Sequence, residues 1–134
     1  MNNDFYNSHL GKMQMHFHTS IRNVGLYISI ATALLGGARY YRKGSDRSRF
    51  KQLLFYILSF TFATNSFLIS KYLLHDHMLV YKKMSNEEKK YVLKWYTILK
   101  ILIFTSSLFL LYIIYLSLNT SKKIIKQYIY NEQI

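Results

Sequence analysis

The sequence predicts an all-α protein, an integral membrane three-helix bundle, and two observations carry this prediction. Three apolar stretches divide the chain, at Val24–Ala38, Gln52–Ser70 and Ile101–Leu118. None of them contains a charged residue, although the chain has 18 Lys and Arg and 6 Asp and Glu. A helix that crosses a bilayer needs about 20 mostly apolar residues, which the second and third stretches provide.

The first stretch is shorter, but the arginines at its ends extend its reach. Arg22 and Arg39 can direct their charged groups to the lipid headgroups while their alkyl stems stay in the apolar layer. We therefore expect one domain of 134 residues with spans at about 22–41, 52–72 and 98–118.

A start signal for the third helix precedes its apolar part. Ser85 and Glu88 have the spacing of a capping box, in which each side chain bonds to the other residue's backbone N–H. The helix is thus expected to begin near Asn86, to project from the bilayer in its first turns, and to end near Asn119.

The segments between and beyond the spans are polar. We expect an N-terminal arm at 1–20, a polar loop at 75–97 that includes the first turns of the third helix, and a basic amphipathic tail at 120–134. The tail places apolar and basic side chains on opposite faces of a helix: Ile124, Ile125, Tyr128 and Ile129 against Lys122, Lys123 and Lys126.

The net charge of +12 indicates an anionic partner. Because the charges flank membrane spans, we expect anionic phospholipids such as cardiolipin, or acidic neighbouring subunits, and no nucleic acid. Basic residues are almost equally frequent on the two sides of the predicted membrane, so their distribution does not define an orientation. The abundance of Lys, Ile, Asn, Tyr and Phe is typical of an AT-rich genome.

Small residues form a stripe on each of the first two spans. Small side chains let helix backbones approach closely in lipid, so both stripes are predicted to be helix-packing interfaces, with a partner or with each other. Asn65 lies near the middle of the second span and is expected to bond across to Ser29, Thr32 or another subunit, because a buried amide needs partners. The stripes are Gly25, Ser29, Ala33 and Gly37, and Ser59, Ala63, Ser66 and Ser70.

Two histidine pairs are expected on one side of the membrane. His16 and His18 precede the first span, and His75 and His77 follow the second. The spacing within each pair is loose and Asp76 is the only nearby carboxylate, so we predict a partner-facing surface and no metal site. The chain also has no cysteine.

No sequence motif of a common enzyme class is present. There is no phosphate-binding loop, zinc-binding helix motif or nucleophile elbow, and Glu87 and Glu88 are accounted for by the helix start. The three apolar stretches hold no ionisable residue other than tyrosine, which argues against a proton pump. We predict that the chain is not an enzyme.

The segment Ser20-Ile21-Arg22-Asn23-Val24-Gly25 and the three-helix architecture resemble the membrane-anchor subunits of succinate dehydrogenase, respiratory complex II. In that family a serine and an arginine, four residues apart at the start of the first helix, help to bind quinone. Here Ser20 and Arg22 are two residues apart and would diverge on a helix, whereas His18 and Arg22 have the family's spacing.

The resemblance covers about residues 18–77 and extends to the second helix. The family has a haem-ligating histidine, a basic residue and an aspartate at offsets that here give Asn65, Lys71 and Asp76. An amide does not ligate haem iron, so this chain is expected to supply no haem ligand. The resemblance implies a site for a quinone or a lipid headgroup at Ser20, Arg22, Lys71, Tyr72 and Asp76.

These features predict a non-catalytic, multi-pass subunit of a respiratory assembly of the mitochondrial inner membrane, with a helical extension on the matrix side. It would anchor or stabilise catalytic subunits of electron transport. The alternative is a small homo-oligomeric pore or transport protein whose path is lined by Asn65, Thr61 and the serines of the second span. A third class, a free-standing redox or metal enzyme, would reveal itself by bound metal or haem.

Overall fold

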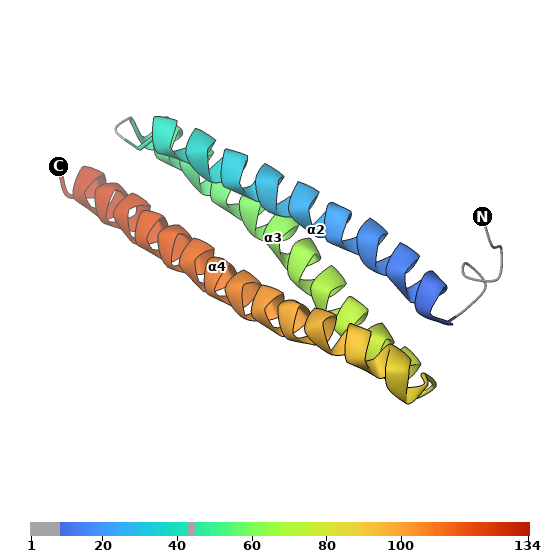
Figure 1. The fold of residues 1–134 in the computed structure, drawn as a ribbon. Helices are drawn as coiled ribbons and strands as arrows, with labels where there is room; N and C mark the ends of the chain where they lie inside the picture. The colour runs from blue at the N-terminus through green and yellow to red at the C-terminus, as the bar shows by residue number, and fades with distance from the viewer. Residues whose placement is uncertain (1–8, 43–44) are drawn as a thin grey trace. The chain divides into compact units, whose positions relative to one another are not determined.

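A computed structural model describes residues 9–42 and 45–134, and these residues fold into helices (Figure 1). The helices are α2 (His9–Tyr40), α3 (Asp46–Tyr81) and α4 (Asn86–Glu132). No strand occurs in these two ranges. All three helices are long and apolar enough to cross a membrane, which confirms the predicted all-α, three-helix membrane architecture.

Most buried side chains recur with a seven-residue period along each helix, and we call this pattern the buried seam. Seven residues is the period at which helices keep one face in contact along their length. The seam consists of Met13, Phe17, Ser20, Val24, Ala31 and Ala38 on α2, Gln52, Tyr56, Ser59, Ala63, Ser66, Ser70, Leu73 and His77 on α3, and Val92, Leu99, Ser106, Ile113 and Thr120 on α4.

The chain divides into two compact units, each of which contains part of every helix. Unit 1 comprises Met1–Leu26 and Asn65–Ser107, and unit 2 comprises Tyr27–Thr64 and Leu108–Ile134. Within each unit buried residues, most of them from the seam, form small apolar clusters. Phe17, Leu73 and Leu99 meet in unit 1, as do Met13, Met84 and Val92. Ala31, Ala63 and Ile113 meet in unit 2.

Helices α2 and α3 extend beyond their expected bounds, and α4 extends beyond its expected end near Asn119. Helix α2 begins at His9, so the described part of the expected arm at 1–20 is helical, while residues 1–8 lie outside the described residues. Helix α3 continues through the expected polar loop to Tyr81. The reason is the same in both places: Met13 and Phe17 on α2, and His77 on α3, continue the buried seam, and their burial favours helix over loop.

Helix α4 begins where the sequence indicates. The Ser85 N–H donates to Glu88 Oε2 (3.3 Å), and the Glu88 N–H donates to Ser85 Oγ (3.4 Å), which confirms the capping box. The helix then runs without a break to Glu132. The basic tail is therefore a continuation of the third helix, and in its range Ile125, Tyr128 and Lys126 are exposed.

The small residues of α3 lie inside the chain. Ser59, Ala63, Ser66 and Ser70 are all buried. In unit 2 the Ser59 Oγ donates a hydrogen bond to the Ala31 carbonyl oxygen of α2 (2.8 Å). Such a bond from a side chain as short as serine requires the two helix backbones to approach closely, as small residues permit.

The small residues of α2 have a different environment. Gly25, Ser29 and Ala33 are exposed, and only Gly37 is partly buried. A β-carbon on Gly37 would lie 3.0 Å from the Phe55 ring, whereas one on Gly25 would have no neighbour within 4 Å. The α2 stripe thus contributes to packing inside the chain at Gly37, and its role toward another chain stays a prediction. Asn65 is exposed as well.

We predict that Ser59→Leu destabilises the chain, because Ser59 is fully buried against the α2 backbone and a larger side chain would force the helices apart. The free energy of unfolding should fall by about 1–3 kcal/mol. Circular dichroism during unfolding in detergent measures this change. Thr61→Leu is the matched control, since Thr61 is exposed on the same helix. Equal effects of the two substitutions would contradict the close packing at Ser59.

Candidate functional site

The most unusual side chain of unit 1 is His77, an imidazole at the end of the buried seam. It is only 1% exposed. Neither ring nitrogen has a hydrogen-bond partner among the described residues. Burying a polar group without a partner is unfavourable, so His77 is a position at which a ligand or a partner could supply a missing hydrogen bond.

Aromatic rings from the other two helices enclose one side of His77. The Phe17 ring of α2 lies 5.5 Å from the His77 ring between centroids, and the Trp95 ring of α4 lies 4.8 Å from that of Phe17. The three rings meet because Phe17 and His77 are seam residues of their helices. These contacts fix the imidazole without using its nitrogens.

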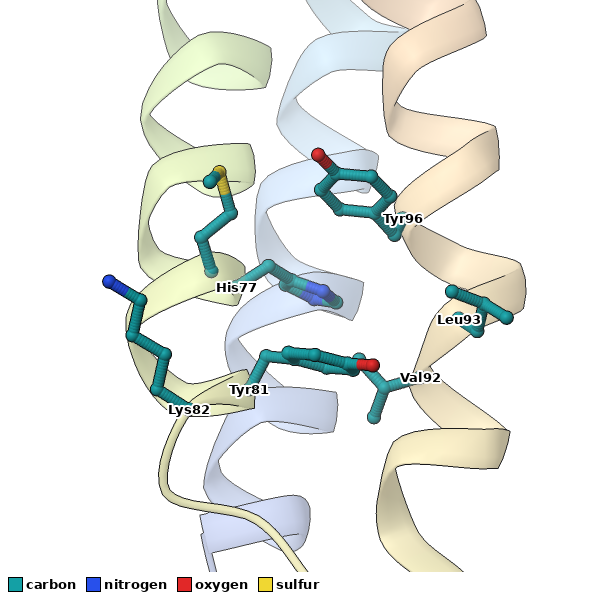
Figure 2. Close-up of a pocket in the computed structure, with 7 residues that line it drawn as sticks. His77, Tyr81, Lys82, Val92, Leu93 and Tyr96 are labelled. Carbon is teal, nitrogen blue, oxygen red and sulfur yellow. The ribbon is translucent and has the colours of Figure 1, made fainter. Parts of the chain in front are cut away.

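The other side of His77 faces a pocket of about 290 Å³. Figure 2 shows the His77 and Tyr81 rings extending from α3 toward α4, where Leu93 and Tyr96 lie. The Lys82 amine points away from the imidazole in this view. Apart from His77, Lys82 and the hydroxyl groups of Tyr81 and Tyr96, the lining is apolar, and the pocket suits a small group with a largely apolar surface.

The five residues predicted to hold a quinone or lipid headgroup differ in their burial. Ser20 is buried, whereas Arg22, Lys71, Tyr72 and Asp76 are exposed. The separation of Ser20 from Arg22 agrees with the divergence expected from their spacing. None of the five lines the pocket at His77, and their proposed ligand stays a prediction.

In unit 1 His16 of the first histidine pair contacts Asp76, which lies between the two histidines of the second pair. The His16 Nε2 lies 3.1 Å from Asp76 Oδ2 and donates to it, with the two side chains 53% and 50% exposed. An ion pair this exposed contributes little stability. Among the described residues, no group of three or more His, Cys, Asp or Glu is arranged to hold a metal ion.

The expectation that His77 lies in a solvated loop is wrong, because the imidazole is buried. One signal in the sequence points to this burial: His77 follows Ser70, a predicted packing residue, by seven positions. Extending the small-residue stripe by this period places the imidazole on the buried face.

Comparison with known protein families, with curated proteins and with solved structures gives no match to this chain. The resemblance to the complex II anchors therefore rests on the residues named above.

We predict that His77→Phe stabilises the purified chain. Phenylalanine keeps the ring contact with Phe17 and removes two buried nitrogens that lack partners, so the free energy of unfolding should rise by about 1–2 kcal/mol. Thermal unfolding in detergent, followed by circular dichroism, measures the change. His75→Phe, at an exposed position, serves as control and should shift stability by less than about 0.5 kcal/mol. A clear loss of stability in His77→Phe would mean that the imidazole nitrogens are already satisfied.

Proposed function

We propose that this chain is a non-catalytic integral membrane subunit that anchors or stabilises the catalytic subunits of a larger assembly. The observation that supports this proposal most directly is the outward-facing apolar surface of the three helices. In the most apolar stretch of α2, α3 and α4, only 17%, 28% and 11% of the residues are buried inside the chain. Lipid and other membrane subunits are the surroundings in which such a surface is stable.

The exposed side chains show that this surface is extensive. Phe104, Leu111 and Tyr115 on α4 are 62–65% exposed. Large apolar groups at these levels of exposure need lipid or a partner chain around them, since water would disfavour them.

The outward stripe of α2 supports a protein partner in addition to lipid. Gly25 and Ala33 are exposed, and space is open beside Gly25. A helix of another subunit could approach the α2 backbone closely along this stripe, which is how helices associate in lipid.

The setting we propose is a respiratory assembly of the mitochondrial inner membrane, and within it a divergent complex II anchor. The support is the resemblance of residues 18–77 together with the three-helix architecture. The pocket at His77 adds aromatic and apolar walls against which a quinone ring can pack. Asn65 supports the expectation that no haem is ligated from this chain.

The alternative of a homo-oligomeric pore fits the burial pattern less well. Ser59, Ser66 and Ser70 would have to face a path between copies, but they are buried inside the chain. Thr61 and Asn65 are exposed and lie on a different face of α3. A single polar row along one face of α3 is therefore not available to line a path.

Copurification tests the proposed function. We expect the chain, extracted in mild detergent and separated on a native gel, to migrate with succinate dehydrogenase flavoprotein and iron–sulfur subunits in stoichiometric amounts, as identified by mass spectrometry. Ala33→Leu should reduce the recovery of these partners, whereas Thr105→Leu, an exposed position on α4, should not. Other respiratory subunits in their place would support an accessory role and contradict the complex II assignment. A chain that migrates only with itself would contradict the subunit proposal.

A further inference from the structure

Unit 2 contains a basic pocket whose residues are far apart in the sequence. Its volume is about 710 Å³, and all three helices contribute to its lining. Four of its residues carry a positive charge: Arg39 from the end of α2, Arg42 just after it, Arg49 from α3 and Lys123 from α4. We call this feature the basic pocket.

Among the residues whose side chains the structure describes, no acidic residue lines the basic pocket. Asp46 and Glu132 are the only acidic residues within the sequence ranges of unit 2. Among the residues whose side chains the structure describes, no carboxylate forms a salt bridge with any of the four cations. Like charges that converge repel one another, so an anion between the four cations would be held strongly.

One of the four cations is fixed by contacts within the unit. The Arg49 Nη1 donates to the side-chain oxygen of Gln127 (2.5 Å) and weakly to the Lys123 carbonyl oxygen (3.5 Å). Arg49 therefore connects α3 to the end of α4, next to Lys123. Arg39 and Arg42 are exposed, and their guanidinium groups can bond to phosphate oxygens in a bidentate manner.

Buried polar groups form another part of the lining. Gln52 and Tyr56 are 6% and 5% exposed, and the Gln52 Nε2 donates to the Tyr56 hydroxyl oxygen (3.0 Å). The Tyr56 O–H keeps its own hydrogen, which can be donated to an anion. Charged, amide and hydroxyl donors thus face one space.

The position along the helices matches the level of lipid headgroups. Arg39 directly follows the first apolar stretch, Gln52 begins the second, and Lys123 lies shortly after the third ends at Leu118. Tyr112 and Tyr115 also line the pocket, and tyrosines are enriched at the boundary between hydrocarbon and headgroups. A ligand at this level would have its charge in the basic pocket and its tails along the apolar helices.

We propose that the basic pocket binds the phosphate-bearing headgroup of an anionic phospholipid, with a preference for a headgroup that carries two phosphates, as in cardiolipin. Two phosphodiester groups carry two negative charges in all, so four cations can place two charged donors beside each phosphate. Basic pockets between membrane helices commonly hold such lipids. The inference rests on the proposed function only in placing the chain in a bilayer.

Native mass spectrometry of the full chain in uncharged detergent, after removal of bound lipid, tests the inference. Cardiolipin, phosphatidylcholine and inorganic phosphate are the three probes. We expect one cardiolipin to bind per chain at least about tenfold more tightly than phosphatidylcholine or phosphate. The double variant Arg39→Gln/Arg42→Gln should lose about tenfold or more of the cardiolipin affinity.

The matched control is Arg47→Gln/Lys126→Gln. It removes the same charge from exposed positions of unit 2 that do not line the basic pocket, and cardiolipin affinity should stay within about twofold. Unchanged circular dichroism spectra of both variants would show that they fold.

Three results would overturn the inference. These are equal affinity for cardiolipin and phosphatidylcholine, equal losses in the two double variants, and phosphate binding as tight as that of cardiolipin, which would indicate a free-phosphate site. The test is separable from copurification. A chain that binds cardiolipin as expected but migrates alone would lose only the proposed function, and one that copurifies with its partners but shows no lipid preference would lose only this inference.

Discussion

The close packing of small side chains on α3 is the constraint on which the rest of the structure depends. Ser59, Ala63, Ser66 and Ser70 occupy the interior positions that large residues would fill in a water-soluble bundle. Their size lets Ser59 reach the backbone of α2, and it leaves the large apolar side chains on the outside. A chain built in this way gains its packing from close backbone contact and depends on lipid or partner helices for its outer surface. The membrane role follows from how the interior is filled as much as from the hydropathy of the spans.

The same seam continues beyond the apolar spans and there carries polar residues. Along α3 it begins with Gln52 and Tyr56 and ends with His77, all of them buried. Each end of the seam on α3 lies beside a pocket. Gln52 and Tyr56 line the basic pocket of unit 2, and His77 lines the pocket at His77 in unit 1. The two pockets have opposite chemistry. One gathers four cations, and the other places an imidazole among largely apolar and aromatic walls. A helix with a continuous interior face can thus provide a site for an anionic headgroup and one for an uncharged ligand.

The sequence predicts where the helices lie well, but it predicts poorly which residues of different helices contact one another. Particular residues show the physical reasons. The three spans and the Ser85 cap depend on local composition and spacing, which the sequence contains directly. The polar residues His75, Asp76 and His77 predict a loop after the second span, but Leu73 and His77 hold this segment in the helix through tertiary contacts. The stripe of Gly25, Ser29 and Ala33 has a spacing of four residues, which turns about 40° around the helix at each step, whereas the buried seam follows a period of seven. The basic pocket could not be predicted, because Arg39, Arg49 and Lys123 meet only through the register of three helices.

The most direct test of the central claim, that three helices cross the membrane, is cysteine labelling, because the chain contains no cysteine of its own. Single variants Ser45→Cys, Lys83→Cys and Gln133→Cys place a thiol at exposed positions after each helix in turn. A maleimide that cannot cross membranes is then applied to sealed vesicles before and after permeabilisation. Three spans predict that the Ser45→Cys and Gln133→Cys variants are labelled from one side and the Lys83→Cys variant from the other. Labelling of all three variants from the same side would contradict the account.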